Sequence, residues 1–195
     1  MSLLLGLLIL AALRLTVGHP AGAWIAAAAL LVCVYAGLTL PDIDQPLPLD
    51  HRSALTHGIA PALALCALRW ARAAVAGLAF GLAFHLSADV FPNAMVGYAT
   101  VAVPFAGRLG AQASYLWLVA NAAACALLGA WLLTRTIAQP WLQAAALLGT
   151  ALIGLWYLPR VDGGWPALAV FLAAAWLVVR QRRLPRIAGL ATSQP

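Results

Sequence analysis

Long apolar stretches, separated by short polar segments, determine what this chain can fold into. A membrane-spanning helix needs about 20 predominantly apolar residues, and each stretch approaches that length while carrying little or no charge. Backbone polar groups inside a bilayer must be paired internally, which favours helices. We therefore predict an all-α fold, a polytopic transmembrane bundle of about seven helices that forms a single integral membrane domain over residues 1–195. The expected helices cover residues 2–17, 24–40, 53–69, 73–91, 114–133, 141–158 and 165–180.

The composition agrees with a membrane protein. Of the 195 residues, 65% are hydrophobic and only 8% are charged, whereas soluble domains carry about 25% charged residues. The net charge of +6 comes entirely from arginine, since the chain contains no lysine. These arginines lie between or after the apolar stretches, where positive charge sets membrane topology. We therefore expect membrane lipids, and no nucleic acid, as partners; the sequence identifies no protein partner.

Two stretches and one loop carry more specific predictions. In the first stretch Arg14 follows the apolar core, the reverse of the order in a secretory signal, so we expect a retained helix. Ser53 is a candidate N-cap for the third helix, and Pro61 is expected to kink that helix. The apolar piece Val101–Phe105 is a candidate for re-entering the membrane.

The fourth expected helix carries a pattern with a four-residue period. Gly77, Gly81, His85 and Asp89 recur every four residues and so share one helical face. Small residues at this spacing allow another membrane helix to approach closely. We expect the two glycines to form a packing stripe that leads to a polar pair at the helix end.

The polar residues concentrate in a core over residues 41–105. Three of the four histidines and four of the five aspartates lie between positions 42 and 89, and the chain contains no glutamate. Ionisable groups at membrane depth are costly unless they are paired or bind a metal, and they mark functional sites. The candidate metal ligands are Asp42, Asp44, His51, His57, His85 and Asp89.

Up-and-down threading of the helices brings these residues to one membrane face. The end of the second helix, the start of the third and the end of the fourth all fall there, whereas His19 falls at the other face. The arginines are unevenly divided between the faces, which by the positive-inside rule makes the C-terminus cytoplasmic and the cluster extracytoplasmic. The arginine-rich face contains Arg14, Arg69, Arg72, Arg135, Arg180, Arg182, Arg183 and Arg186, against Arg52, Arg108 and Arg160 at the cluster face.

A mixed set of imidazoles and carboxylates suits Zn²⁺, or alternatively Mn²⁺, in a hydrolytic site. Six possible ligands can serve one ion or two. A divalent ion lowers the pKa of bound water to about 7 and polarises the bond under attack. Arg52 can hold a phosphate through its planar guanidinium, and Arg52 and Thr56 are the candidate catalytic residues.

Structural roles for the same residues remain open alternatives. Asp42 and Asp44 can form a polar turn, His57 can be a satisfied helix-end histidine, and His85 with Asp89 can be a buried hydrogen-bonded pair. Their joint occurrence at one membrane face favours the metal site.

The ordered motifs Leu40-Pro41-Asp42-Ile43-Asp44, His51-Arg52, Thr56-His57 and His85-x-x-x-Asp89 resemble those of a bacterial family. This is the family of membrane-bound metal-dependent hydrolases, also described as LexA-binding inner-membrane-associated hydrolases. Gly97 and Val103-Pro104-Phe105 can stand in the place of its last motif, a glycine and a Pro-Phe-type segment. The spacing from His51 to His57 is one residue longer than in the family, and Ser53 replaces a glycine. The resemblance implies a hydrolase in the bacterial inner membrane.

We therefore predict a membrane-embedded metal-dependent hydrolase acting on a lipid or amphiphilic substrate at the extracytoplasmic membrane surface. Two alternatives remain: a zinc amidase of the alkaline-ceramidase type, and a non-catalytic scaffold or transporter. A transporter would more often show internal repeats, and the sequence has none. The bond that is hydrolysed stays open among phosphoester, ester and amide.

Overall fold

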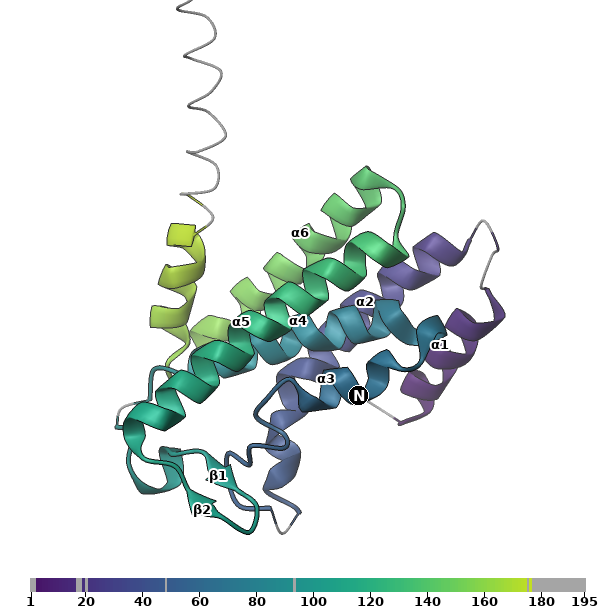
Figure 1. Ribbon diagram of the computed structural model, residues 1–195. Coiled ribbons are helices and arrows are strands. Elements are labelled where there is room, and N and C mark those ends of the chain that lie inside the picture. The colour runs from purple at the N-terminus through teal and green to yellow at the C-terminus, as the bar shows by residue number, and fades with distance from the viewer. Residues whose placement is uncertain are drawn as a thin grey trace, which may run out of the picture.

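A computed structural model describes residues 3–16, 19, 21–47, 49–92, 94–174 and 176, and these residues form an all-α bundle with one small β-hairpin (Figure 1). The predicted fold class and the count of seven α-helices are confirmed for this part of the chain. The α-helices are α1 (Leu3–Leu15), α2 (Gly22–Thr39), α3 (Ala60–Cys66), α4 (Arg72–Asp89), α5 (Ala111–Thr136), α6 (Pro140–Tyr157) and a last helix, Gly164–Ala174. Short 3₁₀ segments are η1 (Pro41–Asp44), η2 (Arg69–Ala71), η3 (Gly97–Ala99) and η4 (Leu158–Arg160).

Four stretches in the described residues are long and apolar enough to cross a membrane, which agrees with an integral membrane protein. The helix α1, with 13 residues, is shorter than a full span. The last helix is described to Ala174, so the remainder of its expected range to residue 180 and the basic tail after it lie outside the described residues. The four stretches are Gly22–Thr39, Arg69–Asp89, Ala111–Thr136 and Pro140–Arg160.

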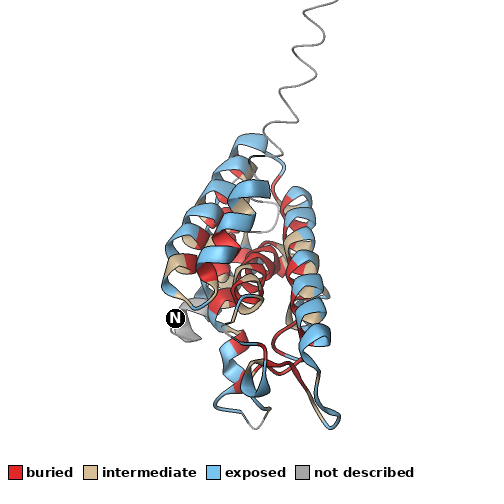
Figure 2. Ribbon diagram, turned by 90° about the vertical axis from the view of Figure 1, so that its left-hand side faces the viewer, coloured by how far each residue is buried: buried red, intermediate tan, exposed pale blue. Residues whose placement is uncertain are grey.

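The helix α4 occupies the centre of the bundle. In the most apolar window of Arg69–Asp89, 78% of the residues are buried, compared with 28–39% in the other three candidate spans. Figure 2 shows this concentration of buried residues in the middle of the molecule. A helix that is buried on nearly all sides has little lipid-facing surface. The packing around α4 therefore holds the side chains at its end, His85 and Asp89, at fixed positions.

The glycine stripe of α4 packs against α2, as the four-residue period predicts. A Cβ added at Gly77 would lie 1.9 Å from the carbonyl oxygen of Leu30, and one at Gly81 would lie 2.1 Å from that of Val34. From the other side, a Cβ at Gly37 would lie 2.3 Å from the carbonyl oxygen of Leu78. The two helices therefore touch backbone to backbone.

The prediction of a third helix starting at Ser53 is wrong. Residues 53–59 form turns, and α3 has only seven residues, or about 10 Å at 1.5 Å per residue. Pro61 lies in the first turn of α3, where a proline is compatible with the helix, so it starts α3 rather than kinking it. The physical reason is that some backbone groups before α3 form hydrogen bonds with distant parts of the chain instead of with a preceding turn of helix.

Val101–Phe105, the candidate re-entrant piece, mostly belongs to a β-hairpin. Strands β1 (Ala102–Val103) and β2 (Gly107–Arg108) pair antiparallel, with Phe105 fully exposed at the turn. Ser53 forms a parallel bridge with Ala102, and the Ala54 amide donates to the Ala102 carbonyl at 2.7 Å. The hairpin therefore supplies hydrogen bonds that a helix at Ser53 would have supplied itself.

Candidate metal centre

Polar side chains from three parts of the chain meet at one end of the bundle. Asp42 and Asp44 belong to η1 after α2, His57 lies in the turns before α3, and His85 and Asp89 end α4. This is the grouping that the threading of the helices predicts. The grouping does not require the long third helix that we predicted, because the turns that contain His57 lie at the same end of the bundle.

Donor atoms of three residues come within the range of a single ion, and Asp89 lies beside two of them. Nε2 of His57 lies 3.4 Å from Oδ2 of Asp89, and Nε2 of His85 lies 3.5 Å from the same oxygen and 4.0 Å from Oδ1 of Asp42. Donor atoms of Asp42, His57 and His85 all lie within 4.8 Å of one another. Two donors to one zinc ion can lie at most about 4.2 Å apart, twice the bond length. The cluster could therefore hold a metal ion after small adjustments.

The outer nitrogen of His57 is held by Asp44. Its Nδ1 lies 3.2 Å from Oδ2 of Asp44, which also accepts hydrogen bonds from the Ser53 amide at 2.9 Å and the Thr56 hydroxyl at 3.3 Å. A proton on Nδ1 makes His57 the donor to this carboxylate and leaves the Nε2 lone pair facing Asp89. A metal-binding histidine typically donates its other ring N–H to a carboxylate or carbonyl in this way.

The outer nitrogen of His85 is held in the same way by a carbonyl. Its Nδ1 lies 2.9 Å from the Leu38 carbonyl oxygen, which can only accept, so Nδ1 carries the proton. The Tyr157 hydroxyl lies 3.2 Å from that nitrogen. An N–H at Nδ1 leaves the Tyr157 oxygen as an acceptor and its hydrogen free to point into the cavity.

Asp89 has one occupied oxygen and one without a hydrogen-bond donor. Oδ1 accepts from Arg52 at 2.8 Å, whereas Oδ2 is buried without a hydrogen bond among the described residues. Oδ2 is the oxygen that faces the two imidazoles. Burying an unpaired carboxylate oxygen is costly unless a proton or a cation lies beside it. The unpaired oxygen therefore marks the position that a cation would fill.

Burial lowers the pKa of His57 to about 4, although the nearby carboxylates of Asp89 and Asp44 act in the opposite direction. His57 is therefore a neutral imidazole near neutral pH. A neutral imidazole is the form that binds metals. The Nε2 nitrogen of His57 is then free to bind a cation next to the carboxylate of Asp89.

Arg52 is fixed by its backbone and by two partners. It adopts a left-handed conformation with φ of 58°, and its guanidinium donates to Asp89 and, at 2.6 Å, to the Ala99 carbonyl. Arg52 is buried, so the ion pair with Asp89 is shielded from water. In this arrangement Arg52 orients Asp89 rather than presenting a free fork to a phosphate.

The donors line a cavity of about 280 Å³. The Asp42 side chain is 50% exposed, which opens the cluster to the outside, whereas the His57 side chain is 1% exposed. Two lining residues, Tyr157 and Asp162, come from the end of α6 and the loop after it. Sequence reasoning did not assign these two to the site. The same threading could have found them, since it brings the end of α6 to the cluster face.

The remaining predicted residues lie around this group. Thr56 is buried and contacts both Asp44 and His57 Nδ1, so it supports the outer side of the His57 ring. His51 lines the cavity, but its ring centroid is 6.2 Å from that of His57 and it stacks on Tyr98 at 5.6 Å. Asp44 likewise faces the outer side of His57. The structure thus brings Asp42, His57, His85 and Asp89 together, and puts Asp44, His51, Arg52 and Thr56 next to them.

The irregular segment that carries His57 is tied down by α5. Trp117 donates from Nε1 to the His57 carbonyl at 2.8 Å, and Asn121 Oδ1 accepts from the Ile59 amide at 2.9 Å. Non-helical backbone at membrane depth is tolerated only where protein satisfies its polar groups. These two contacts pair the His57 carbonyl and the Ile59 amide and fix the position of His57.

No protein-family model, curated protein or solved structure matches this chain.

Proposed function

We propose that the chain is a metal-dependent hydrolase whose ion is bound by Asp42, His57, His85 and Asp89. The observation that carries the proposal is the convergence of two imidazole nitrogens on the buried, unpaired Oδ2 of Asp89, at 3.4 and 3.5 Å. A purely structural pair would need one imidazole and one carboxylate. Here two imidazoles lie beside the same carboxylate oxygen, and a second carboxylate, Asp42, lies near them.

The donor chemistry favours Zn²⁺, with Mn²⁺ as the second candidate, because imidazole and carboxylate together suit both ions. The compactness of the group favours one ion, since the Asp44 carboxylate is engaged by His57, Ser53 and Thr56. A divalent ion would activate water near neutral pH and polarise the bond under attack.

The protein's own side chains have separable roles in this proposal. Asp44 and the Leu38 carbonyl orient the two imidazoles, and Arg52 orients Asp89. Tyr157 can donate its hydroxyl hydrogen to an oxygen of a substrate in the cavity, where negative charge develops during hydrolysis. Asp162, which lines the same cavity, is a candidate proton acceptor.

The substrate class follows from the site's position at the ends of α2, α4 and α6, three candidate membrane spans. An amphiphile whose scissile phosphoester, ester or amide lies near headgroup level would reach this cavity with its chain in the bilayer. The motif resemblance to bacterial membrane-bound metal-dependent hydrolases supports the same class. On this proposal the protein resides in the bacterial inner membrane.

The orientation is a separate part of the proposal. Positive-inside asymmetry makes the cluster extracytoplasmic and the C-terminus cytoplasmic. A topology reporter fused after Gln194 should therefore report the cytoplasm, and one inserted near Gln45 should report the other side. Two reporters on the same side would contradict the orientation.

Metal analysis of the detergent-purified protein tests the function. A hydrolase should carry stoichiometric transition metal, release fatty acid or phosphate from a panel of bacterial phospholipids, and lose both properties together on chelation. Protein that binds no metal after incubation with Zn²⁺ or Mn²⁺ would instead support the scaffold alternative. Hydrolysis that persists in metal-free protein would contradict the metal-dependent mechanism.

A further inference from the structure

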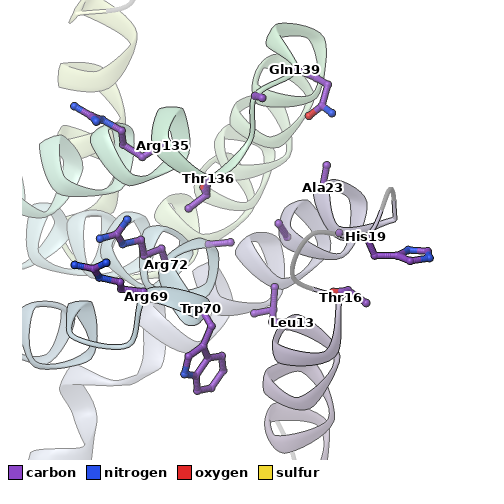
Figure 3. A pocket seen from close by; sticks show the side chains of 14 residues that line it. Leu13, Thr16, His19, Ala23, Arg69, Trp70, Arg72, Arg135, Thr136 and Gln139 are labelled. Atoms are coloured by element: carbon purple, nitrogen blue, oxygen red, sulfur yellow. The ribbon is translucent and has the colours of Figure 1, made fainter.

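A second cavity, of about 580 Å³, lies at the end of the bundle opposite the metal centre (Figure 3). It is lined by the end of α1, the start of α2, the start of α4 and the end of α5. Three arginines contribute to its wall: Arg69 and Arg72 around the start of α4, and Arg135 in the last turn of α5. In Figure 3 their side chains all extend to the left of the view, whereas the His19 ring points outward on the right.

The chain provides no carboxylate side chain for these arginines. All five aspartates line the metal-site cavity or the hollow next to it, which contains Asp44, Asp50 and His51. Among the described residues, none of the three arginines has an ion-pair partner. Arg135 lies over the Trp131 ring at 5.5 Å, which leaves its N–H groups available. The cavity therefore has excess positive charge that an external anion can balance.

Much of the remaining cavity wall is apolar, although Thr16, His19, Thr136 and Gln139 also line it. Leu13, Ala23, Ala26 and Ala73 line it together with Trp70, over whose ring Arg14 lies at 6.0 Å. A small free anion would not bury this apolar surface, whereas an amphiphile would cover it with the part of its chain nearest the headgroup. The arginines suit the charged phosphate of a lipid, and the apolar residues suit the beginning of its acyl chains.

We propose that this cavity binds the phosphate headgroup of an anionic phospholipid. Arginine suits this ligand because its planar fork makes paired hydrogen bonds to phosphate oxygens. The N-terminal ends of α2 and α4 also lie at the cavity, and their helix dipoles add positive potential. Basic pockets between membrane helices bind such headgroups in other proteins. This site is distinct from the metal centre and does not depend on its function.

The positive-inside rule alone accounts for arginines at this end, but it makes a different prediction. Topology needs only charge and is served equally well by lysine or by scattered positions. A phosphate site needs the fork of arginine on a common cavity. Arginine-to-lysine variants therefore separate the two explanations while keeping topology intact.

The test is lipid binding by the full-length protein in detergent, measured by native mass spectrometry with phosphatidylglycerol and phosphatidylcholine. The wild type should retain phosphatidylglycerol selectively. Each of Arg69→Gln, Arg72→Gln and Arg135→Gln should weaken that binding about five-fold, and the Lys variants should weaken it by a smaller factor. Arg160→Gln is the matched control, because Arg160 lies over Trp156 at 4.7 Å as Arg135 lies over Trp131, but near the other end.

Three outcomes would overturn the proposal: equal binding of both lipids by the wild type, unchanged selectivity in a triple Gln variant, or an equal loss in Arg160→Gln. Inorganic phosphate that displaces phosphatidylglycerol at millimolar concentration would overturn the lipid assignment in favour of a free-phosphate site. If the Gln variants do not fold, the wild type alone decides. Its melting temperature should rise in micelles doped with phosphatidylglycerol at low salt, but not in 0.5 M salt, and a salt-independent rise would contradict the proposal.

Discussion

The two ends of the helical bundle differ in whether their charged side chains are paired within the protein. At the metal centre Arg52 and Asp89 are paired at 2.8 Å, and the Asp44 and His57 side chains are at most 1% exposed. At the arginine cavity Arg69 and Arg135 are exposed, and no carboxylate side chain of the chain reaches them. The difference teaches that charges enclosed by protein must be satisfied by protein, whereas charges at an open cavity can await a ligand.

The backbone differs between the ends as well. The metal end contains the turns before α3 and the hairpin, whose polar groups are bound by Ser53, Trp117 and Asn121. In the described residues the arginine end consists of helix ends, the 3₁₀ segment η2 and short connections. A precise cluster of donors thus required backbone outside helices, whereas a cavity for a flexible lipid did not.

The largest effect is expected from the contact that supports both ends. Gly81→Leu would drive a side chain into the backbone of α2, where even a Cβ lies 2.1 Å from the Val34 carbonyl oxygen. Overpacking typically costs about 1–3 kcal/mol, and a backbone clash lies at the upper end of that range or above it. Melting in detergent should show a strong loss of stability, with loss of metal and lipid binding together. Gly110→Ala, where a Cβ has open space, is the control; equal melting of the two variants would refute the packing argument.

His85→Ala and His19→Ala compare the ends directly. Loss of a ligand should reduce metal affinity by more than the roughly 10–100-fold typical of outer partners, so His85→Ala should purify without metal. His19→Ala should keep full occupancy, since His19 is exposed at the other end. Elemental analysis of both membrane-inserted proteins measures the difference. Full occupancy in His85→Ala, or loss in His19→Ala, would remove the proposed ligand set.

Asp44→Ala tests how far the metal end extends beyond its donors. Because Asp44 contacts the outer nitrogen of His57, its removal should weaken metal affinity about 10–100-fold while occupancy recovers at high metal concentration. Asp42→Ala should not recover in this way. Titration of metal-free protein followed by fluorescence or calorimetry gives the affinities, with exposed Asp50→Ala as the control. If Asp44→Ala behaves as Asp42→Ala does, Asp44 is a ligand itself.

The smallest effect is expected where α5 supports the turn before α3. Asn121→Ala leaves the Ile59 amide without its acceptor, and loss of such a hydrogen bond costs about 1 kcal/mol. The melting temperature should fall by a few degrees, and metal affinity should fall slightly because His57 loosens. Thr134→Ala removes only an exposed, local hydrogen bond on the same helix and should change neither. A neutral Asn121→Ala would show that the turn is held by other contacts.

Helix number, the glycine stripe and the grouping of Asp42, His57, His85 and Asp89 were all predictable from the sequence. Each depends on local periodicity or on the order of helix ends. The shortness of α3 was not predictable, because the turns over Ser53–Ile59 depend on hydrogen bonds that distant residues accept. The Ala54 amide donates to the Ala102 carbonyl and the Ile59 amide to Oδ1 of Asn121. The outer positions of Asp44 and Arg52 were also hidden, since ligand and supporting residues are of the same types and only distances separate them.

The glycine contact between α2 and α4 also bears on which ions the metal centre would accept. Asp42 follows α2, and His85 lies in the last part of α4, so the separation of these two donors depends on the spacing of the two backbones. At Gly37 and Gly81 no side chain lies between the helices that could adapt. Ca²⁺ has ligand distances of about 2.3–2.6 Å, against about 2.0–2.2 Å for Zn²⁺. On the proposed function, discrimination by ionic radius would thus be set by the backbone spacing of two helices as well as by the chemistry of the ligands.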